Sequence, residues 1–245
     1  MFKKILFSII IIVVYFLGGC KSTPDISKNN VSEEYNYNII TIDPTTMVRP
    51  TENRDAMIVY NMGTYAMSQN LLQQAELLLL KAIELDTEFI DAMDHLGIVY
   101  RRQSRYKEAE EMYLKSIGLN DNNKVPYINL AVIYGLQGKL NDALELYKKV
   151  IEIDHNDPEG YFGVGSINYI IKDYDASITF LSIAEDLYKK NNSPFITSVY
   201  YYKGLISYNL GNFDDALWYL EEARKGNLNN ETIERTINDI NSKKE

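Results

Sequence analysis

Few residues in the chain have side chains suited to catalysis or metal binding, and they lie far apart in the sequence. The single cysteine is Cys20, and the two histidines are His95 and His155. A metal site or a catalytic triad needs several such groups to converge. The sequence motifs of nucleotide-phosphate loops, serine hydrolases and zinc proteases are also missing. We therefore predict a protein that is not an enzyme and that uses no cofactor and no metal.

A local cluster of basic residues is the other feature that could bind a small ligand. It consists of Arg101, Arg102, Arg105 and Lys107, in a chain whose formal net charge is −9. Such a cluster either binds a phosphate or an anionic headgroup or is ordinary surface charge, and we favour ordinary surface charge. An acidic chain has no general reason to hold nucleic acid, because that affinity depends on neutralising phosphates. We expect no nucleic-acid partner.

The segment before Cys20 predicts how this thiol is used. Lys3 and Lys4 precede an apolar run that extends from residue 5 to residue 17, and two glycines follow it. A basic start, a short apolar stretch and small residues are the order of a secretory signal peptide. A membrane-spanning helix is the alternative, but it needs about 20 apolar residues and this run is shorter. We predict a signal peptide over residues 1–19.

The end of this segment, Leu17-Gly18-Gly19-Cys20, resembles the lipobox of bacterial lipoproteins. The resemblance implies cleavage between Gly19 and Cys20 and attachment of lipid to Cys20. The mature chain would then be exported and held on a membrane of the bacterial cell envelope. Lys21 follows where inner-membrane lipoproteins of enteric bacteria carry Asp, so by analogy the outer membrane is favoured over the inner membrane.

Residues 20–54 have the composition of a spacer. They are mostly polar, contain Pro24, Pro44 and Pro50, and show no helical or strand periodicity. We predict a polar tether that joins the lipidated cysteine to the folded part of the chain. Residues 35–40 are aromatic and apolar, so the sequence leaves open whether residues 35–50 are ordered.

From about residue 55 onward the chain repeats itself with a period of 34 residues. Five segments align, and the step into the fifth is 39 residues because of additional residues around 189–194. Apolar residues recur at i, i+3, i+4 and i+7 on either side of a polar or glycine-containing turn, which predicts pairs of helices. The alignment rests on small residues, which are Gly63, Gly97, Ala131, Gly165 and Gly204 at position 8 and Ala75, Ala109, Ala143, Ser177 and Ala216 at position 20.

This pattern resembles the tetratricopeptide repeat (TPR), a helix–turn–helix unit of 34 residues. The resemblance covers about residues 55–225 and implies an all-α fold, a right-handed TPR superhelix (α-solenoid) of about five repeats. A C-terminal capping helix is predicted over residues 229–242, because Ile233, Ile237 and Ile240 form one apolar stripe. The predicted repeats cover about residues 56–89, 90–123, 124–157, 158–196 and 197–228.

The resemblance also implies where a partner binds. In TPR arrays the first helices line a concave groove, and positions 2, 5, 9, 12 and 13 usually face it. Most tyrosines here fall on packing positions, but several large residues at positions 5, 9 and 12 do not, and we expect them to form an exposed, largely aromatic patch. Such patches anchor partners. The predicted partner-binding residues are Tyr60, Asp94, Ile98, Arg101, Ile128, Val132, Phe162, Tyr169, Tyr201, Leu205 and Tyr208.

We therefore predict a lipid-anchored, non-enzymatic scaffold or adaptor that binds a protein or peptide segment in this groove. A glycan- or lipid-binding lipoprotein that uses the same groove is the alternative, and self-assembly through the convex face is a third hypothesis. Tyr60 and Thr64 stand where TPR modules that capture chaperone C-termini carry basic or amide side chains. We expect no chaperone-tail binding.

Overall fold

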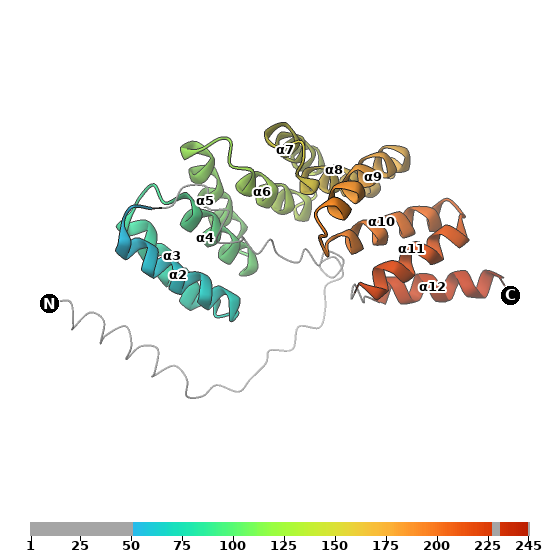
Figure 1. Cartoon of the computed structure of the whole chain (residues 1–245), viewed down its shortest axis with the longest axis horizontal. Coiled ribbons are helices and arrows are strands. Elements are labelled where there is room, and N and C mark those ends of the chain that lie inside the picture. The colour runs from blue at the N-terminus through green and yellow to red at the C-terminus, as the bar shows by residue number, and fades with distance from the viewer. Residues whose placement is uncertain (1–50, 227–230, 245) are drawn as a thin grey trace, which may run out of the picture. The chain divides into compact units, whose positions relative to one another are not determined.

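The computed structural model describes residues 51–226 and 231–244, which belong to one unit of the chain, Asp43–Glu245. The predicted signal peptide, Cys20 and nearly all of the predicted tether lie outside these residues. Within the described ranges every regular element is an α-helix (Figure 1). The helices are α2 (Arg54–Ser68), α3 (Leu72–Leu85), α4 (Ile90–Arg102), α5 (Tyr106–Leu119), α6 (Lys124–Leu136), α7 (Leu140–Ile153), α8 (Pro158–Ile170), α9 (Tyr174–Lys190), α10 (Ile196–Asn209), α11 (Phe213–Lys225) and α12 (Glu231–Lys244).

The helices form five antiparallel pairs followed by a single helix. The pairs are α2–α3, α4–α5, α6–α7, α8–α9 and α10–α11, and the second helix of each pair packs against the first helix of the next pair (Figure 1). Each first helix also contacts the first helix of the following pair. The last helix, α12, packs against α11 and α10. This arrangement confirms the predicted fold class, an all-α array of five helix–turn–helix repeats with a C-terminal helix.

Local sequence signals explain where the helices begin. The Asn53 side chain accepts hydrogen bonds from the backbone N–H groups of Asp55 and Ala56, and Asn123 and Asp157 cap α6 and α8 in the same way. These caps satisfy N–H groups that have no partner within the helix. Each turn inside a pair instead places one residue, at repeat position 15, in the left-handed region. These residues are Asn70, Ser104, Gly138, Lys172 and Gly211, with φ between 58° and 78°.

Two glycines show how closely the helices approach. A Cβ atom on Gly97, at repeat position 8 of α4, would lie 2.4 Å from the Tyr113 ring of α5. A Cβ atom on Gly163 of α8 would lie 2.2 Å from the Tyr147 ring of α7. The first contact lies within a repeat and the second lies between repeats. Small residues are therefore required at both kinds of helix crossing.

The fourth repeat departs from the regular pattern in a way that the sequence spacing indicated. Its second helix, α9, has 17 residues, against 13 or 14 in the other second helices. Beyond it, Lys203 occupies repeat position 7 of α10, which is apolar in the other repeats. Lys203 is 8% exposed and pairs with Glu185 of α9. The buried cation is thus neutralised by the preceding repeat.

Candidate partner-binding surface

Most of the predicted groove residues pack inside the array. Eight of the eleven are less than a tenth exposed, and only Arg101, Tyr169 and Tyr208 keep partial exposure. The expectation of an exposed patch at positions 5 and 9 is therefore wrong, while a role of these residues in binding stays a prediction. The eight buried residues are Tyr60, Asp94, Ile98, Ile128, Val132, Phe162, Tyr201 and Leu205.

The contacts of Tyr60 illustrate why position 5 is buried. The Tyr60 ring lies 4.8 Å from the Phe89 ring, and its hydroxyl lies 3.1 Å from His95 Nδ1 on α4. The large side chain therefore reaches across to the neighbouring first helix. Because successive first helices contact each other directly, a residue at this position fills the space between them and does not face solvent.

The same packing occurs in the C-terminal half of the array. The Phe162 ring of α8 lies 5.6 Å from the Tyr202 ring of α10 and 6.4 Å from the Tyr188 ring of α9, both edge-to-face. The Tyr201 and Tyr202 rings are 5.4 Å apart. Such aromatic pairs stabilise packing beyond the area that they bury. This aromatic cluster is therefore part of the core of the array.

The three partly exposed residues share repeat position 12, near the C-terminal ends of α4, α8 and α10. Apolar residues at positions 13 and 14 extend this surface, because Leu136, Ile171 and Leu210 are 38%, 52% and 50% exposed. Successive first helices lie side by side, so their C-terminal ends follow one another along one edge of the array. We call this set the helix-end row, and it consists of Arg101, Leu136, Tyr169, Ile171, Tyr208 and Leu210.

The apolar members of the helix-end row are not among the binding residues predicted from the sequence. Position 14 is not one of the predicted groove positions, although a large apolar residue directly before a turn is an available signal. The tyrosines of the row are held in place by neighbours. The Tyr169 ring lies 5.3 Å from the Tyr202 ring, and the Tyr208 hydroxyl donates a hydrogen bond to Asp239 of α12. Ordered aromatic side chains lose little conformational entropy when they bind a partner.

A buried polar cluster lies in the N-terminal half of α4. Asp94 is 1% exposed, and its Oδ2 atom accepts a hydrogen bond of 2.7 Å from Asn123 Nδ2. Its Oδ1 atom has no hydrogen-bond donor in the described part of the chain. Burial raises the pKa of the Asp94 carboxyl to about 7. Asp94 was predicted as a residue that faces a partner, and the structure instead places it beneath the surface.

His95 lies next to this cluster and is also buried. Its Nδ1 atom lies 2.9 Å from the Asp91 carbonyl and 3.1 Å from the Tyr60 hydroxyl. Burial lowers the pKa of His95 to about 4, so the ring is neutral near pH 7. His95 is therefore a buried residue of the array and not a solvated one. The other histidine, His155, is exposed.

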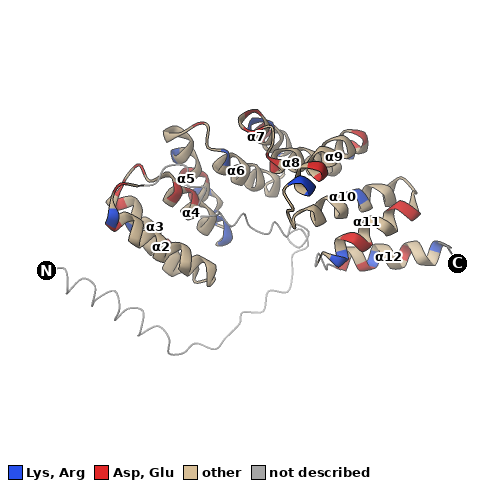
Figure 2. Ribbon diagram, viewed as in Figure 1, with Lys and Arg blue, Asp and Glu red and all other residues tan. Residues whose placement is uncertain are grey.

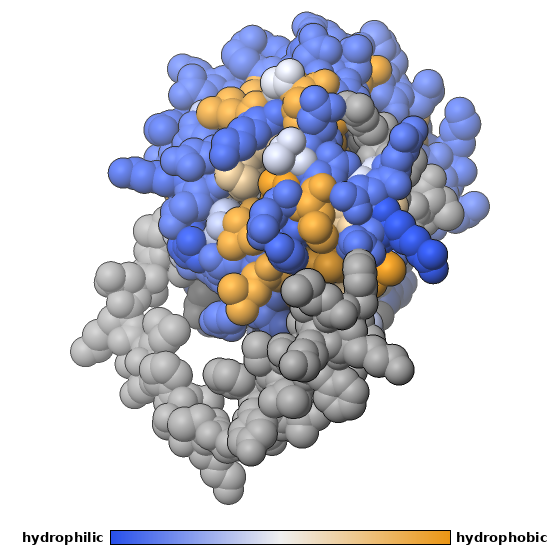
Figure 3. Space-filling model, turned by 90° about the vertical axis from the view of Figure 1, so that its left-hand side faces the viewer, coloured by the Kyte–Doolittle hydropathy of each residue, from blue (hydrophilic) through white to orange (hydrophobic). Residues whose placement is uncertain are grey.

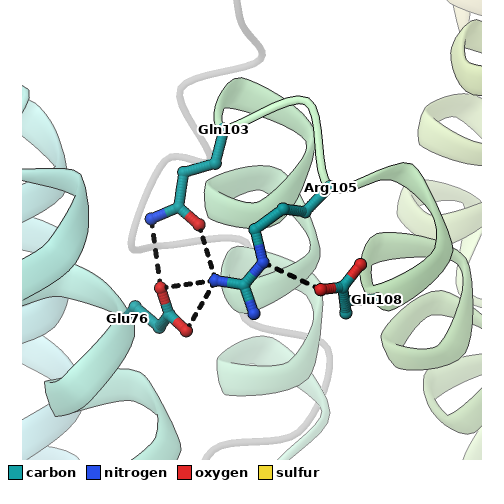
Figure 4. A network of polar contacts seen from close by, with 4 residues as sticks. All are labelled: Glu76, Gln103, Arg105 and Glu108. Carbon is teal, nitrogen blue, oxygen red and sulfur yellow. Dashed lines mark hydrogen bonds and ion pairs between the residues drawn. The ribbon is translucent and has the colours of Figure 1, made fainter.

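Two of the four residues of the basic cluster, Arg102 and Arg105, donate hydrogen bonds to other groups of the protein. Arg105 Nη1 donates to both oxygens of Glu76, at 2.8 and 2.9 Å, and its Nε donates to Glu108 at 2.9 Å (Figure 4). Gln103 contacts both Glu76 and Arg105, so the network joins the first repeat to the turn of the second. Arg102 donates to the Met67 carbonyl. These two arginines connect repeats, a structural role that the favoured interpretation of ordinary surface charge did not include.

No group of three or more histidine, cysteine or acidic residues is placed to hold a metal ion in the described ranges. Among the described helices, none is both long enough and apolar enough to cross a bilayer.

Two of the helix pairs, α4–α5 and α6–α7, match models of a known protein family. Residues 89–119 and 126–157 each match a family model described as tetratricopeptide repeat. No curated protein sequence matches the chain. Together with the fold, these matches show that the chain carries tetratricopeptide repeats, a class whose members generally act as protein–protein interaction scaffolds.

Solved structures agree on the fold. A chain of the APC/C hetero-tetramer Cut9–Hcn1 aligns with 78% of this chain at a TM-score of 0.72 and 19% identity, and this chain spans 37% of its length. PilF of Pseudomonas aeruginosa aligns over 70% of this chain and 76% of its own chain, at a TM-score of 0.62 and 19% identity. YrrB is described as a TPR protein with an unusual peptide-binding site. It aligns over 73% of this chain and 89% of its own chain, at a TM-score of 0.52 and 23% identity. At such identities the likeness shows the fold alone.

Proposed function

We propose that the protein is a lipid-anchored, non-enzymatic adaptor of the bacterial cell envelope that binds a protein segment along the helix-end row. The observation that carries the proposal is the recurrence of exposed apolar residues at equivalent ends of α6, α8 and α10. The TPR class and the peptide-binding site named for YrrB support a protein or peptide partner. This proposal moves the contact from positions 5 and 9 of the predicted groove to positions 12–14.

The chemistry of the row defines the kind of segment that it fits. Ile171 and Leu210 offer two apolar contacts one repeat apart, and Tyr169 and Tyr208 offer a ring beside each. Exposed apolar groups are favourable to bury against a partner. Arg101 adds a cation at the α4 end of the row. A partner segment with regularly spaced apolar side chains and an acidic end matches this pattern.

The membrane anchor is part of the same proposal and rests on the sequence. Residues 1–19 would be removed, Cys20 would carry lipid, and the outer membrane is favoured over the inner membrane. Several acyl chains on one protein make such attachment effectively stable. Replacing Cys20 by Ala is expected to move the protein from the membrane fraction to the soluble fraction of the cell. Persistence of the variant in the membrane fraction would argue against lipid anchoring.

Crosslinking in the native cell followed by capture of the chain tests the binding surface. The test variant is Ile171→Glu with Leu210→Glu, and the control is Leu114→Glu with Ile178→Glu. All four side chains are between 37% and 53% exposed, so neither double variant disturbs the core. We expect a protein captured by the wild type and by the control to be lost from the test variant.

Two other outcomes decide between the alternatives. Equal capture by both variants would show that the row is not the interface. If no protein is captured but glycans or lipids raise the melting temperature of the wild type and not of the test variant, the glycan- or lipid-binding alternative replaces the adaptor.

A further inference from the structure

The first repeat exposes a stripe of α2 that every later repeat buries. Repeat position 10 is Tyr65 in α2 and is 67% exposed, whereas Val99, Ile133, Ile167 and Ile206 at the same position are at most 3% exposed. Positions 3 and 7 behave in the same way. Ile58 is 48% and Met62 is 38% exposed, and their counterparts in the four later repeats are all buried.

In later repeats a second helix of the preceding repeat covers these positions. At position 3, a Cβ atom on Gly160 would lie 2.7 Å from Ile151 of α7. At position 7, Lys203 pairs with Glu185 of α9. The exposed stripe of α2 is therefore the same surface that elsewhere forms the interface between repeats. Figure 3, which views the array from the α2–α3 side, shows hydrophobic residues gathered in the middle of this face.

Charge decides which kind of neighbour fits this face. From Ala56 to Ser68, α2 contains no charged residue, and its ribbon is free of blue and red beyond its first turn (Figure 2). Two identical copies of such a surface can meet without bringing like charges together, although the whole chain is strongly acidic. The stripe is also continuous along one helix face, because residues 58, 62 and 65 are spaced i, i+4 and i+7.

The opposite end of the array does not offer a matching surface. The exposed residues of α12 with described side chains are all polar or charged, and they are Glu231, Arg235, Asn238, Asn241, Ser242 and Lys243. Head-to-tail stacking of copies would therefore bury charges against apolar side chains, which is costly. Of the two ways in which the ends of two copies could meet, head-to-head contact is the one that the end surfaces favour.

We propose that this end face, formed by Ile58, Met62 and Tyr65 of α2, is the interface of a homodimer. The α2 helix of one copy packs antiparallel on the α2 helix of a second copy about a two-fold axis, so the middle residue, Met62, lies next to Met62 of the second copy. In this contact the α2 helix of the second copy takes the place that the second helix of a preceding repeat has in later repeats. It does not involve the helix-end row, so each copy keeps its own row available for a partner.

Thiol crosslinking of the full chain in intact cells tests the dimer. Met62→Cys is compared with Leu114→Cys, an exposed α5 position, and with the wild type, which contains only Cys20. After treatment with a bismaleimide, we expect the Met62→Cys chain to run at twice its mass. The Leu114→Cys and wild-type chains report any crosslinking caused by crowding on a membrane, and we expect at least a fivefold weaker dimer band from them.

A second change separates a specific interface from chance collision. Tyr65→Glu added to Met62→Cys places a charge in the interface, and we expect it to remove the dimer band without changing helix content, because Tyr65 is exposed in the single chain. An unchanged band would overturn the proposal. So would a Met62→Cys product whose mass fits a different protein, or a chain that stays at its single mass.

Discussion

The two ends of the array meet solvent in opposite ways. At the C-terminal end, α12 buries Ile233, Ile237 and Ile240 against the last repeat and turns polar residues outward. At the N-terminal end, α2 leaves Ile58 and Tyr65 uncovered. An array of repeats needs terminal surfaces that tolerate water. The C-terminal end meets this need with an additional helix, whereas the N-terminal end retains the composition of an internal repeat.

The difference also shows what repeat position 7 tolerates. In the first repeat Met62 is exposed at this position, and in the last repeat Lys203 is buried there beside Glu185. Which side chain is tolerated at this position thus depends on the residues that surround it and not on the repeat pattern alone.

The largest effect is expected at the buried ion pair. Glu185→Ala leaves the Lys203 ammonium buried without its partner, and we expect a loss of about 3–5 kcal/mol in the free energy of unfolding. Met62→Lys places the same cation at position 7 of the first repeat, where it is solvated, and should cost less than about 0.5 kcal/mol in dilute protein. Chemical denaturation of both variants measures the difference. Equal losses would mean that the two ends are alike.

Truncation of an apolar residue at each end should separate the ends next. Ile233 of α12 is fully buried, so Ile233→Ala is expected to cost about 2–4 kcal/mol. Ile58→Ala should cost less than about 0.5 kcal/mol in protein dilute enough to be monomeric. Thermal melts followed by circular dichroism provide the comparison. A large loss for Ile58→Ala at low concentration would show that the N-terminal face is covered within the single chain.

The pH dependence of stability should differ between the two halves. The pKa of Asp94 is raised, so the folded chain holds this proton more tightly than the unfolded chain, and ionisation destabilises the fold as pH rises from about 4 through about 7. Burial acts to raise the pKa of Glu185, but hydrogen bonds from Lys189 and Lys203 outweigh it and the pKa is lowered. Stability from Glu185 is therefore present above the ordinary glutamate pKa and is lost as pH falls.

Asp94→Asn tests the first of these dependences. We expect the variant to be more stable than the wild type by on the order of 1–2 kcal/mol at about pH 8, and by less at about pH 5, where the wild-type carboxyl is protonated in the fold. The pKa of His95 is lowered, so its protonation destabilises the fold as pH falls below about 6.5. This effect is the same in the wild type and in the Asp94→Asn variant, so it cancels from their difference. A gain that is independent of pH would contradict the assignment to Asp94.

The smallest effects are expected at the turns. Asn70 in the first repeat and Gly211 in the last both adopt positive φ, at 58° and 78°. Gly211→Ala should cost about 1 kcal/mol because a Cβ atom is unfavourable there, and Asn70→Gly should change stability by only a few tenths of a kcal/mol. Differential scanning calorimetry resolves these shifts. If Gly211→Ala leaves the stability unchanged, the backbone of the last turn relaxes to accommodate the Cβ atom.

Much of this fold was predictable because repetition amplifies a local signal. Position 8 alone allows any small residue, but five small residues at that position, together with five at position 20, define helix crossings that only pairs of close helices require. The spacing also located the additional residues around 189–194, where the structure has the end of the longer α9. The lipobox at Leu17–Cys20 remains a prediction of the same kind, since it depends on the local sequence.

The exposure of individual side chains was not predictable in this way. Tyr60 and Phe162 were expected to face a partner, and they fill the space between successive first helices, while Leu136, Ile171 and Leu210 were missed at the edge. Burial of these residues depends on the distance between helices that are about 34 residues apart, and no single repeat encodes that distance. The sequence by itself therefore determined the repeat, its helices and its small residues. Only the tertiary structure decided which surfaces stay open, because each repeat is covered by its neighbours.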